Sequence, residues 1–343
     1  MTESLQDIAR RLVAPGKGIL AADESSSTIK KRFDSIQLES TADARRDYRE
    51  MLFSADEAMR NHVSGVILFD ETIRQQAKDG RPLVERITAT GAIPGIKVDM
   101  GAKPLAFFPG ETVTEGLDGL RERLVEYYKL GARFAKWRAV ITIGENLPTA
   151  GALSANAHGL ARYAALCQEN GIVPIVEPEV LMDNPNATHT IETCHKVTEE
   201  TLRIVFEELE RARVDLSGMI LKPNMVVPGK DSGQNADPSE VAERTVAVFR
   251  ATVPAAVPGI AFLSGGQSDQ LATEHLSRIN AIGDLPWGIT FSYGRALQAA
   301  ALKAWGGKAE NVAAGQRAFL HRCRMNGLAA LGQWNAELER EVA

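Results

Sequence analysis

Short apolar runs alternate with amphipathic segments along most of the chain. Eight runs rich in β-branched or other apolar residues cover residues 18–23, 65–70, 95–99, 133–138, 172–177, 219–222, 260–264 and 288–293. Their length and composition are typical of buried strands. The segments between them include helical patterns, such as the stripe of Leu202, Val205, Phe206 and Leu209 within residues 198–213, and residues 241–250 repeat this pattern.

Strands that alternate with helices predict a parallel sheet, and eight such units predict closure into a barrel. The alternative is an open doubly wound sheet, which usually carries a glycine fingerprint after its first strand. Here the nearby candidate, Gly16-Lys-Gly18, lies at the start of the first run instead of after it. We therefore predict the α/β class and a (β/α)8 TIM barrel with additional N- and C-terminal helices.

The ends of the chain complete this prediction. Leu5, Ile8 and Leu12 have helical spacing, and residues 297–305 and 312–334 are expected to form the closing and terminal helices. We expect one domain over residues 1–343, with the terminal helix and tail from about residue 310.

Composition narrows the classes of function. The chain has 343 residues, of which 44% are hydrophobic and 24% charged, as is ordinary for a soluble globular protein. A net charge of −5 disfavours a general nucleic-acid surface, and no apolar run approaches the roughly 18 residues of a membrane span. The N-terminus has no apolar secretion segment, and Glu3 and Asp7 argue against a transit peptide, so we expect the cytoplasm. Cys167, Cys194 and Cys323 form no CxxC pair and are expected to be reduced.

Charged residues stand where several apolar runs end, and lysines are prominent among them: Asp23, Lys97, Lys136, Glu177 and Lys222. The C-terminal ends of strands form the active site of TIM barrels. A second ammonium about 4 Å away costs on the order of 4 kcal/mol at an effective dielectric of 20, so we expect crowding to lower a lysine pKa. Lys222 follows the apolar Met-Ile-Leu, and we choose it as the amine that attacks a carbonyl to form a Schiff base.

Other side chains at this edge are candidates for moving protons. Glu177 and Glu179 flank a proline, and either is suited to general acid or base catalysis. For Glu179 alone, an ion pair that positions a lysine is the favoured alternative. Asp23 is placed to orient or deprotonate a hydroxyl, and Tyr293 is a further candidate.

Two regions predict binding of anions. Ser264, Gly265 and Gly266 follow the seventh run, and Gly294 and Arg295 follow the eighth, where many barrels bind phosphate. A second set offers hydroxyls and cations to another anion: Ser25, Thr28, Arg32, Lys97 and Arg138. For this second set a solvated charged helix is the alternative.

The histidines do not predict a metal site. The six of them form no HxxxH or HExxH pair, and Cys194 and His195 are adjacent without a further ligand. We expect neither a metal nor another cofactor.

Several strings resemble the class I fructose-bisphosphate aldolases. They include Phe134-Ala-Lys-Trp-Arg138, Leu221-Lys-Pro-Asn-Met225 and Phe262-Leu-Ser-Gly-Gly-Gln267, with residues 14–25, 65–69, 95–99, 171–179, 291–298 and 301–307. The strings occur in order from about residue 5 to residue 330, so the resemblance covers nearly the whole chain.

The resemblance implies a specific reaction and specific roles. The reaction is the reversible cleavage of fructose 1,6-bisphosphate to dihydroxyacetone phosphate and glyceraldehyde 3-phosphate in glycolysis and gluconeogenesis, without a cofactor and typically in a homotetramer. Lys222 would form the Schiff base, Glu177 would transfer protons beside Glu179, and Asp23 and Lys136 would assist carbinolamine formation and carbon–carbon cleavage. The residues implied for one phosphate are Ser264, Gly265, Gly266 and Arg295, and those around the other are Arg32, Lys97, Ser25 and Thr28.

The chain departs from the family pattern at two places. Its last residues, Glu339-Arg-Glu-Val-Ala343, lack the terminal tyrosine that assists proton exchange in long-tailed members, so we expect slower or differently assisted protonation. Ser27 stands where the family commonly has glycine. The alternatives are another Schiff-base barrel such as a transaldolase, an aldolase that prefers a monophosphate, and a non-catalytic scaffold on the same barrel.

Overall fold

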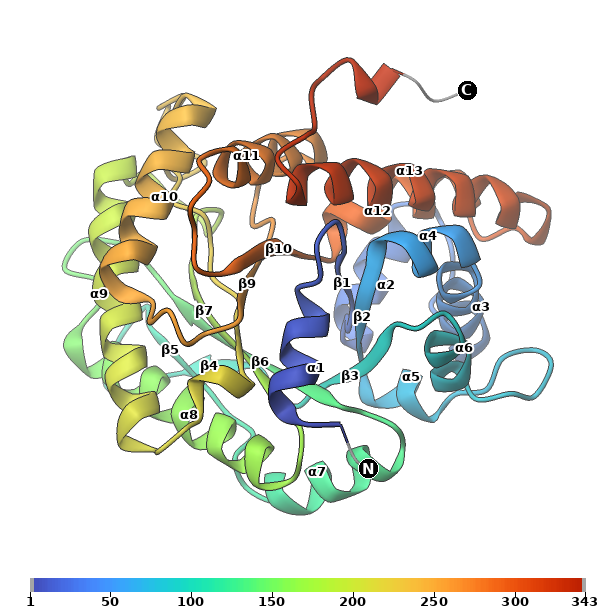
Figure 1. The fold of residues 1–343 in the computed structure, drawn as a ribbon, viewed down its shortest axis with the longest axis horizontal. Helices are drawn as coiled ribbons and strands as arrows, with labels where there is room; N and C mark the ends of the chain where they lie inside the picture. The colour runs from blue at the N-terminus through green and yellow to red at the C-terminus, as the bar shows by residue number, and fades with distance from the viewer. Residues whose placement is uncertain (1–2, 341–343) are drawn as a thin grey trace.

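A closed barrel of parallel strands forms the centre of the molecule, in a computed structural model that describes residues 3–340 (Figure 1). The strands follow one another around the barrel in the order β1, β10, β9, β8, β7, β6, β3 and β2. Their bounds are β1 (Gly18–Ala22), β2 (Val63–Leu68), β3 (Ile93–Lys97), β6 (Phe134–Ile141), β7 (Val173–Val180), β8 (Ile220–Leu221), β9 (Gly259–Phe262) and β10 (Gly288–Tyr293). Each predicted run overlaps one of these strands, so the predicted barrel is confirmed.

Apolar side chains fill one end of the barrel interior. Phe134 lies there with Ile67, Ile93 and Ile175, and α1 (Leu5–Leu12) packs Ile8 and Leu12 against the same cluster. The hydroxyl of Ser64 on β2 donates to the carbonyl oxygen of Leu12 at 2.6 Å. Helix α1 therefore closes this end of the barrel, and the polar side chains gather at the other end.

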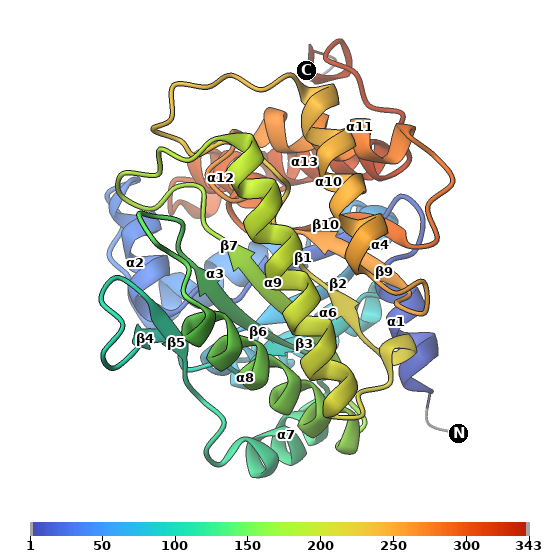
Figure 2. The same cartoon turned by 90° about the vertical axis from the view of Figure 1, so that its left-hand side faces the viewer.

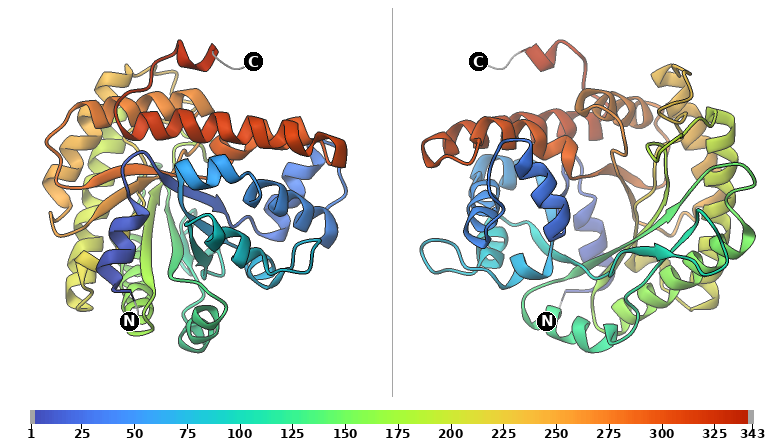
Figure 3. Two further views of the ribbon diagram at one scale, coloured as in Figure 1. Left: turned by 45° about the vertical axis from the view of Figure 1, so that its right-hand side comes forward. Right: turned by 180° about the vertical axis from the view of Figure 1, so that it is seen from behind.

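Helices surround the barrel, and α8 and α9 lie side by side on its outside (Figure 2). They are α2 (Ser26–Asp34), α3 (Ala42–Phe53), α4 (Asp56–His62), α5 (Asp70–Arg74), α6 (Leu83–Ala89), α7 (Leu120–Lys129), α8 (Ala150–Glu169), α9 (Ile191–Arg211), α10 (Pro238–Thr252), α11 (Asp269–Ala281), α12 (Arg295–Trp305) and α13 (Val312–Ala330), with short 3-10 turns η1 (Leu216–Gly218), η2 (Ala309–Asn311) and η3 (Leu338–Arg340). Helix α13 extends across the molecule and packs on α12 and α4 (Figure 3). No helix among residues 3–340 is long and apolar enough to span a membrane.

Some predicted boundaries were wrong. Helix α9 begins well before residue 198, because the Thr190 side chain caps it by accepting from the amide of Thr193. The last predicted helix ends at Ala330, and Gly332 follows with a positive φ of 69°. The antiparallel pair β4 (Ala102–Pro104) and β5 (Thr112–Thr114) was not predicted. Residues 1, 2 and 341–343, which belong to the predicted domain and tail, lie outside the described residues.

Candidate active site

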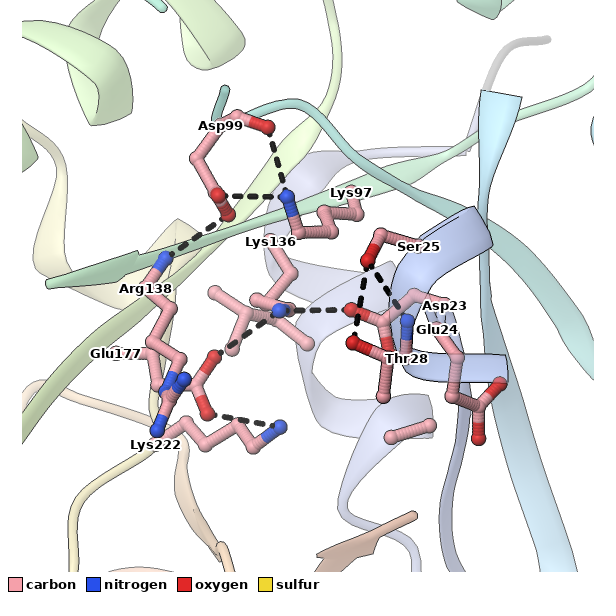
Figure 4. Close-up of polar contacts among 12 residues, drawn as sticks. Asp23, Glu24, Ser25, Thr28, Lys97, Asp99, Lys136, Arg138, Glu177 and Lys222 are labelled. Carbon is pink, nitrogen blue, oxygen red and sulfur yellow. Dashed lines mark hydrogen bonds and ion pairs between the residues drawn. The ribbon is translucent and has the colours of Figure 1, made fainter. Parts of the chain in front are cut away.

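Four charged side chains form a connected group at the polar end of the barrel (Figure 4). The ammonium of Lys136 lies 2.7 Å from Asp23 Oδ2 and 3.4 Å from Glu177 Oε2. The other oxygen of Glu177, Oε1, lies 3.1 Å from the ammonium of Lys222. The side chains of Lys136 and Lys222 are each 5% exposed and that of Glu177 is 4% exposed. One buried carboxylate therefore bridges two lysines that come from different strands.

The position of Lys136 within its strand differs from the prediction. It is the third residue of β6, not its end, because β6 and β7 pair with each other beyond it as far as Ile141 and Val180. Lys136 is nevertheless level with Lys97, the last residue of β3, in the barrel register. Both amines therefore reach the same end of the barrel.

The pKa of Lys136 is governed by its carboxylate neighbours, so Lys136 is not the lysine that crowding is expected to deprotonate. Burial lowers the pKa of Lys136, but the carboxylates of Asp23, Glu177 and Asp99 outweigh burial and raise that pKa above its ordinary value. The same contacts act on the other partner: burial raises the pKa of Asp23, and Lys136 with Lys222 and Lys97 holds it well below its usual range. Lys136 is therefore an ammonium ion at neutral pH, and Asp23 is a carboxylate.

Two further ion pairs hold cations at the mouth. Lys97 donates to Asp99 Oδ1 at 2.6 Å and to the Asp99 carbonyl oxygen at 2.8 Å. The guanidinium of Arg138 contacts Glu179 Oε2, and this carboxylate counteracts burial so that the pKa of Arg138 is raised. Glu179 thus has the positioning contact predicted for it, with an arginine as its partner instead of a lysine.

The start of α2 brings hydroxyl groups to the same mouth. Ser25 caps this helix by accepting from the amide of Thr28, and the two hydroxyls lie 3.1 Å apart. Ser25 and Thr28 line a cavity of about 540 Å³. Its other lining residues include Asp23, Glu24, Arg32, Lys97, Asp99, Lys136, Arg138 and Gly294. The residues predicted to bind the second anion therefore line one cavity together with Asp23 and Lys136.

Residues after β9 and β10 lie partly as predicted. Ser264 is buried, and Gly266 has a positive φ of 51°. The guanidinium of Arg295 turns away from the cavity, because its Nη2 donates to the carbonyl oxygen of Gln267 and its Nη1 contacts Asp269 Oδ1 at 3.2 Å. Gly294 lies at the cavity, where a Cβ atom would come 3.4 Å from Arg32 Nη2.

The hydroxyl of Tyr293 does not reach the mouth of the barrel. The side chain is fully buried, and its hydroxyl donates to the carbonyl oxygen of Ala272 on α11 at 3.0 Å. Burial raises the pKa of this phenol above its ordinary value. The side chain of Tyr293 therefore contacts the helix layer, and a part for Tyr293 in substrate binding stays a prediction.

Sequence reasoning missed a network that extends from the wall of the cavity into the helix layer. Glu24 pairs with Arg32 and with Arg49 on α3, and it also accepts from Gln298 on α12 at 2.9 Å. Only the adjacency of Glu24 to Asp23 hinted at a role, since Arg49 and Gln298 lie on helices without a distinctive pattern. No group of three or more histidine, cysteine, aspartate or glutamate side chains that could hold a metal ion occurs within residues 3–340.

The fold and the site together define a TIM-barrel enzyme with lysine amines and carboxylates at the C-terminal ends of its strands. The family model of class-I fructose-bisphosphate aldolases, described as glycolytic, matches residues 4–343. The chain belongs to this family. The predicted fold class and enzyme class are thereby confirmed: it is a carbon–carbon lyase of glycolysis, with fructose-bisphosphate aldolase activity.

Individual relatives agree with this result. A probable class 1 fructose-bisphosphate aldolase from Xanthomonas axonopodis pv. citri is 57% identical over 97% of this chain and 98% of its own length. A cytosolic fructose-bisphosphate aldolase from Arabidopsis thaliana is 53% identical over 95% of this chain and 82% of its own length. The structure is similar to that of the Plasmodium falciparum aldolase, crystallised in a ternary complex with TRAP and a small-molecule inhibitor, with a TM-score of 0.93, 48% identity and coverage of 97% and 95% of the two chains.

Proposed function

We propose that this chain cleaves fructose 1,6-bisphosphate through a Schiff base on Lys222. The observation that carries this assignment is the sharing of Glu177 by two lysines. Lys136 contacts two carboxylates and its pKa is raised, so it is held as a cation and is a poor nucleophile. Within residues 3–340, Lys222 forms an ion pair with a single carboxylate oxygen, Oε1 of Glu177, and this oxygen is placed to receive the proton that the amine must lose.

The remaining steps use the same four side chains. The neutral amine of Lys222 adds to the C2 carbonyl of the open-chain sugar, and the carbinolamine loses water with a proton supplied by Glu177. Glu177, ionised again after this dehydration, accepts the proton of the C4 hydroxyl. The electron pair of the C3–C4 bond moves into the iminium, and glyceraldehyde 3-phosphate leaves. Glu177 then gives this proton to C3 of the enamine, and addition of water to the iminium releases dihydroxyacetone phosphate and regenerates Lys222.

Asp23 and Lys136 support the charges that these steps create. The ammonium of Lys136, 2.7 Å from Asp23, stabilises negative charge that develops on the C2 and C4 oxygens. Asp23 keeps Lys136 in place and is an ionised acceptor for a sugar hydroxyl. Glu179 acts through Arg138, which it holds at the mouth.

The two phosphates bind at opposite sides of the mouth in this proposal. Ser25, Thr28, Arg32, Lys97 and Arg138 line one cavity and are assigned to one phosphate. Ser264, Gly265, Gly266 and Arg295 are assigned to the other, with the backbone of Tyr293 and Gly294 beside them. Arg295 must release Asp269 and Gln267 to reach a ligand.

We also propose a cytoplasmic homotetramer built from a single domain over residues 1–343. The cytosolic Arabidopsis relative, at 53% identity, supports the location. The proposed number of subunits, four, is supported by the family resemblance. Size-exclusion chromatography coupled to light scattering measures it directly.

The activity is tested by incubating the protein with fructose 1,6-bisphosphate and excess EDTA, and coupling triose phosphate release to NADH oxidation. We expect full activity. Loss of activity in EDTA that zinc restores would contradict the Schiff-base mechanism. Equal kcat/KM for fructose 1-phosphate and fructose 1,6-bisphosphate would remove the second phosphate site and favour the monophosphate alternative.

A further inference from the structure

Arg32 on α2 lines the cavity of about 540 Å³ that is assigned to one phosphate, and its guanidinium is already paired with a carboxylate. The side chain of Arg32 is 23% exposed, and its guanidinium contacts Oε1 of Glu24, whose side chain is 4% exposed. Glu24 Oε1 also accepts from the amide of Gln298 at 2.9 Å. An arginine neutralised by a buried glutamate offers little net charge to a phosphate, because the pair as a whole is neutral.

A third charge behind the pair changes this balance. Arg49 on α3 is 3% exposed, and its Nη2 lies 2.5 Å from Glu24 Oε2. The guanidinium also stands over the ring of Tyr48, 5.7 Å from its centroid. Arg49 is not among the residues that line the cavity, so it does not reach the substrate. The set of Arg32, Glu24 and Arg49 carries a net charge of about +1.

The contact between Arg49 and Glu24 is electrostatic in character. Within residues 3–340, Glu24 Oε2 and Arg49 Nη1 are both buried without a hydrogen-bond partner, although the two side chains form an ion pair. The geometry fits a residue that is retained for its positive charge.

We propose that Arg49 is a positioning residue for substrate recognition. It neutralises Glu24 from the side opposite the cavity, so that Glu24 holds Arg32 in place without cancelling the positive charge that Arg32 presents to the sugar phosphate. This proposal rests on the assignment of Arg32 to a phosphate in the proposed function.

The central test is Arg49→Met, which keeps the length of the side chain and removes its charge. Glu24 then neutralises Arg32 fully. A charge-assisted contact with phosphate contributes about 1.5–3 kcal/mol, so we expect KM for fructose 1,6-bisphosphate to rise roughly tenfold to a hundredfold while kcat changes less than about threefold. Arg49→Lys keeps the charge, and its KM should stay within about threefold of the wild type.

A double variant separates charge balance from structure. Arg49→Met combined with Glu24→Gln removes both buried charges, returns the net charge near Arg32 to +1, and also avoids the folding defect that an unpaired buried Glu24 would cause. Its KM should be at least threefold lower than that of Arg49→Met, and the rise that remains over the wild type measures the loss of the ion pair by which Glu24 holds Arg32. A purely structural role for Arg49 predicts instead that the double variant is as impaired as the single one, and this result would overturn the proposal.

Two further variants make the outcomes distinguishable. Arg45→Met on the same helix removes an ion pair to Glu71 away from the cavity, and it should leave KM unchanged. Arg32→Met should raise KM at least as much as Arg49→Met. If Arg32→Met leaves KM unchanged, the phosphate assignment of the proposed function fails. If Arg32→Met raises KM and Arg49→Met does not, the inference about Arg49 alone fails.

Discussion

Removing the charge of Lys136 should destabilise the protein strongly, because this ammonium lies between two buried carboxylates. Lys136→Met keeps the apolar stem of the side chain and deletes the cation 2.7 Å from Asp23 and 3.4 Å from Glu177. At an effective dielectric of 20, these contacts correspond to about 6 and about 5 kcal/mol of attraction. The desolvation of the ammonium, which the variant no longer has to bear, offsets several kcal/mol of that sum.

The net loss of stability in Lys136→Met should be similar to that measured when one partner of a buried ion pair is removed from other proteins. We expect the free energy of unfolding at pH 7 to fall by about 3–5 kcal/mol, since the two carboxylates lose the cation that contacts both of them. The measurement is urea denaturation followed by fluorescence, at constant buffer and ionic strength.

The pKa shifts of Asp23 and Lys136 determine how the stability lost in Lys136→Met depends on pH. The pKa of Asp23 is lowered in the folded protein, so its stabilisation is complete above its ordinary pKa of 3.8 and is lost as the pH falls below that value. The pKa of Lys136 is raised, so its stabilisation is complete below its ordinary pKa of 10.5 and is lost above it. The difference between wild type and variant should therefore be flat from about pH 5 to pH 9 and shrink toward acid.

An exposed pair of the same type provides the control. Lys30 and Asp34 lie 2.8 Å apart on the surface, and Lys30→Met should cost less than about 1 kcal/mol. A loss of under about 1 kcal/mol for Lys136→Met at pH 7, or a difference that grows as the pH falls from 7 to 4, would refute this account of the site.

Three other substitutions test the packing and the corrected positions. Gly95→Ala should lower the free energy of unfolding by about 3 kcal/mol or more in a urea titration, because the new Cβ would come 2.3 Å from the ring of Phe134 inside the barrel. Tyr293→Phe should keep kcat/KM within about twofold in the coupled assay, because the lost hydroxyl bonds to the helix layer. Nδ1 of His275 donates to Oε1 of Gln267 at 2.6 Å, and burial lowers the pKa of His275 to about 4. His275→Asn should therefore lose about 3 kcal/mol less stability than the wild type between pH 6.5 and pH 4.

Controls exist for each of these variants. Gly159→Ala on α8 meets no atom within 4 Å and should stabilise the protein by about 0.5–1 kcal/mol; destabilisation by both glycine variants alike would contradict the packing argument. A hundredfold loss of kcat/KM in Tyr293→Phe would show that the hydroxyl of Tyr293 takes part in the reaction. An acid sensitivity of His275→Asn equal to that of the wild type would show that another group titrates.

The barrel was predictable because two features of the sequence indicate each strand, its apolar composition and the residues at its ends. Each run is apolar, and most are bounded by glycine and by a polar end, so the eightfold alternation identifies the architecture even where β8 shrinks to Ile220–Leu221. The ends of α9 and α13 depend on a cap at Thr190 and on the backbone turn at Gly332, and both were misplaced. The β4–β5 pair was not predictable, because Ala102–Pro104 and Thr112–Thr114 are three residues each and too short to show an alternating apolar pattern.

The site was only partly predictable, because charge depends on contacts between distant segments. The lysines and acids could be chosen from their places on strands, but whether crowding raises or lowers the pKa of Lys136 depends on Asp23 and Glu177, which come from other parts of the barrel. Glu24 follows Asp23 immediately, yet its role becomes visible only when α3 brings Arg49 against it. The turn of Arg295 toward Asp269 likewise depends on packing that the sequence does not reveal.

Identification of the amine that binds the sugar tests the central claim most directly. The protein is incubated with fructose 1,6-bisphosphate, the iminium is reduced with borohydride, and the modified peptide is mapped by mass spectrometry. The account predicts a sugar-derived adduct on Lys222. This adduct should be absent in Lys222→Ala, and any adduct formed in Lys136→Met should again lie on Lys222. An adduct on Lys136, or undiminished labelling in Lys222→Ala, would contradict it.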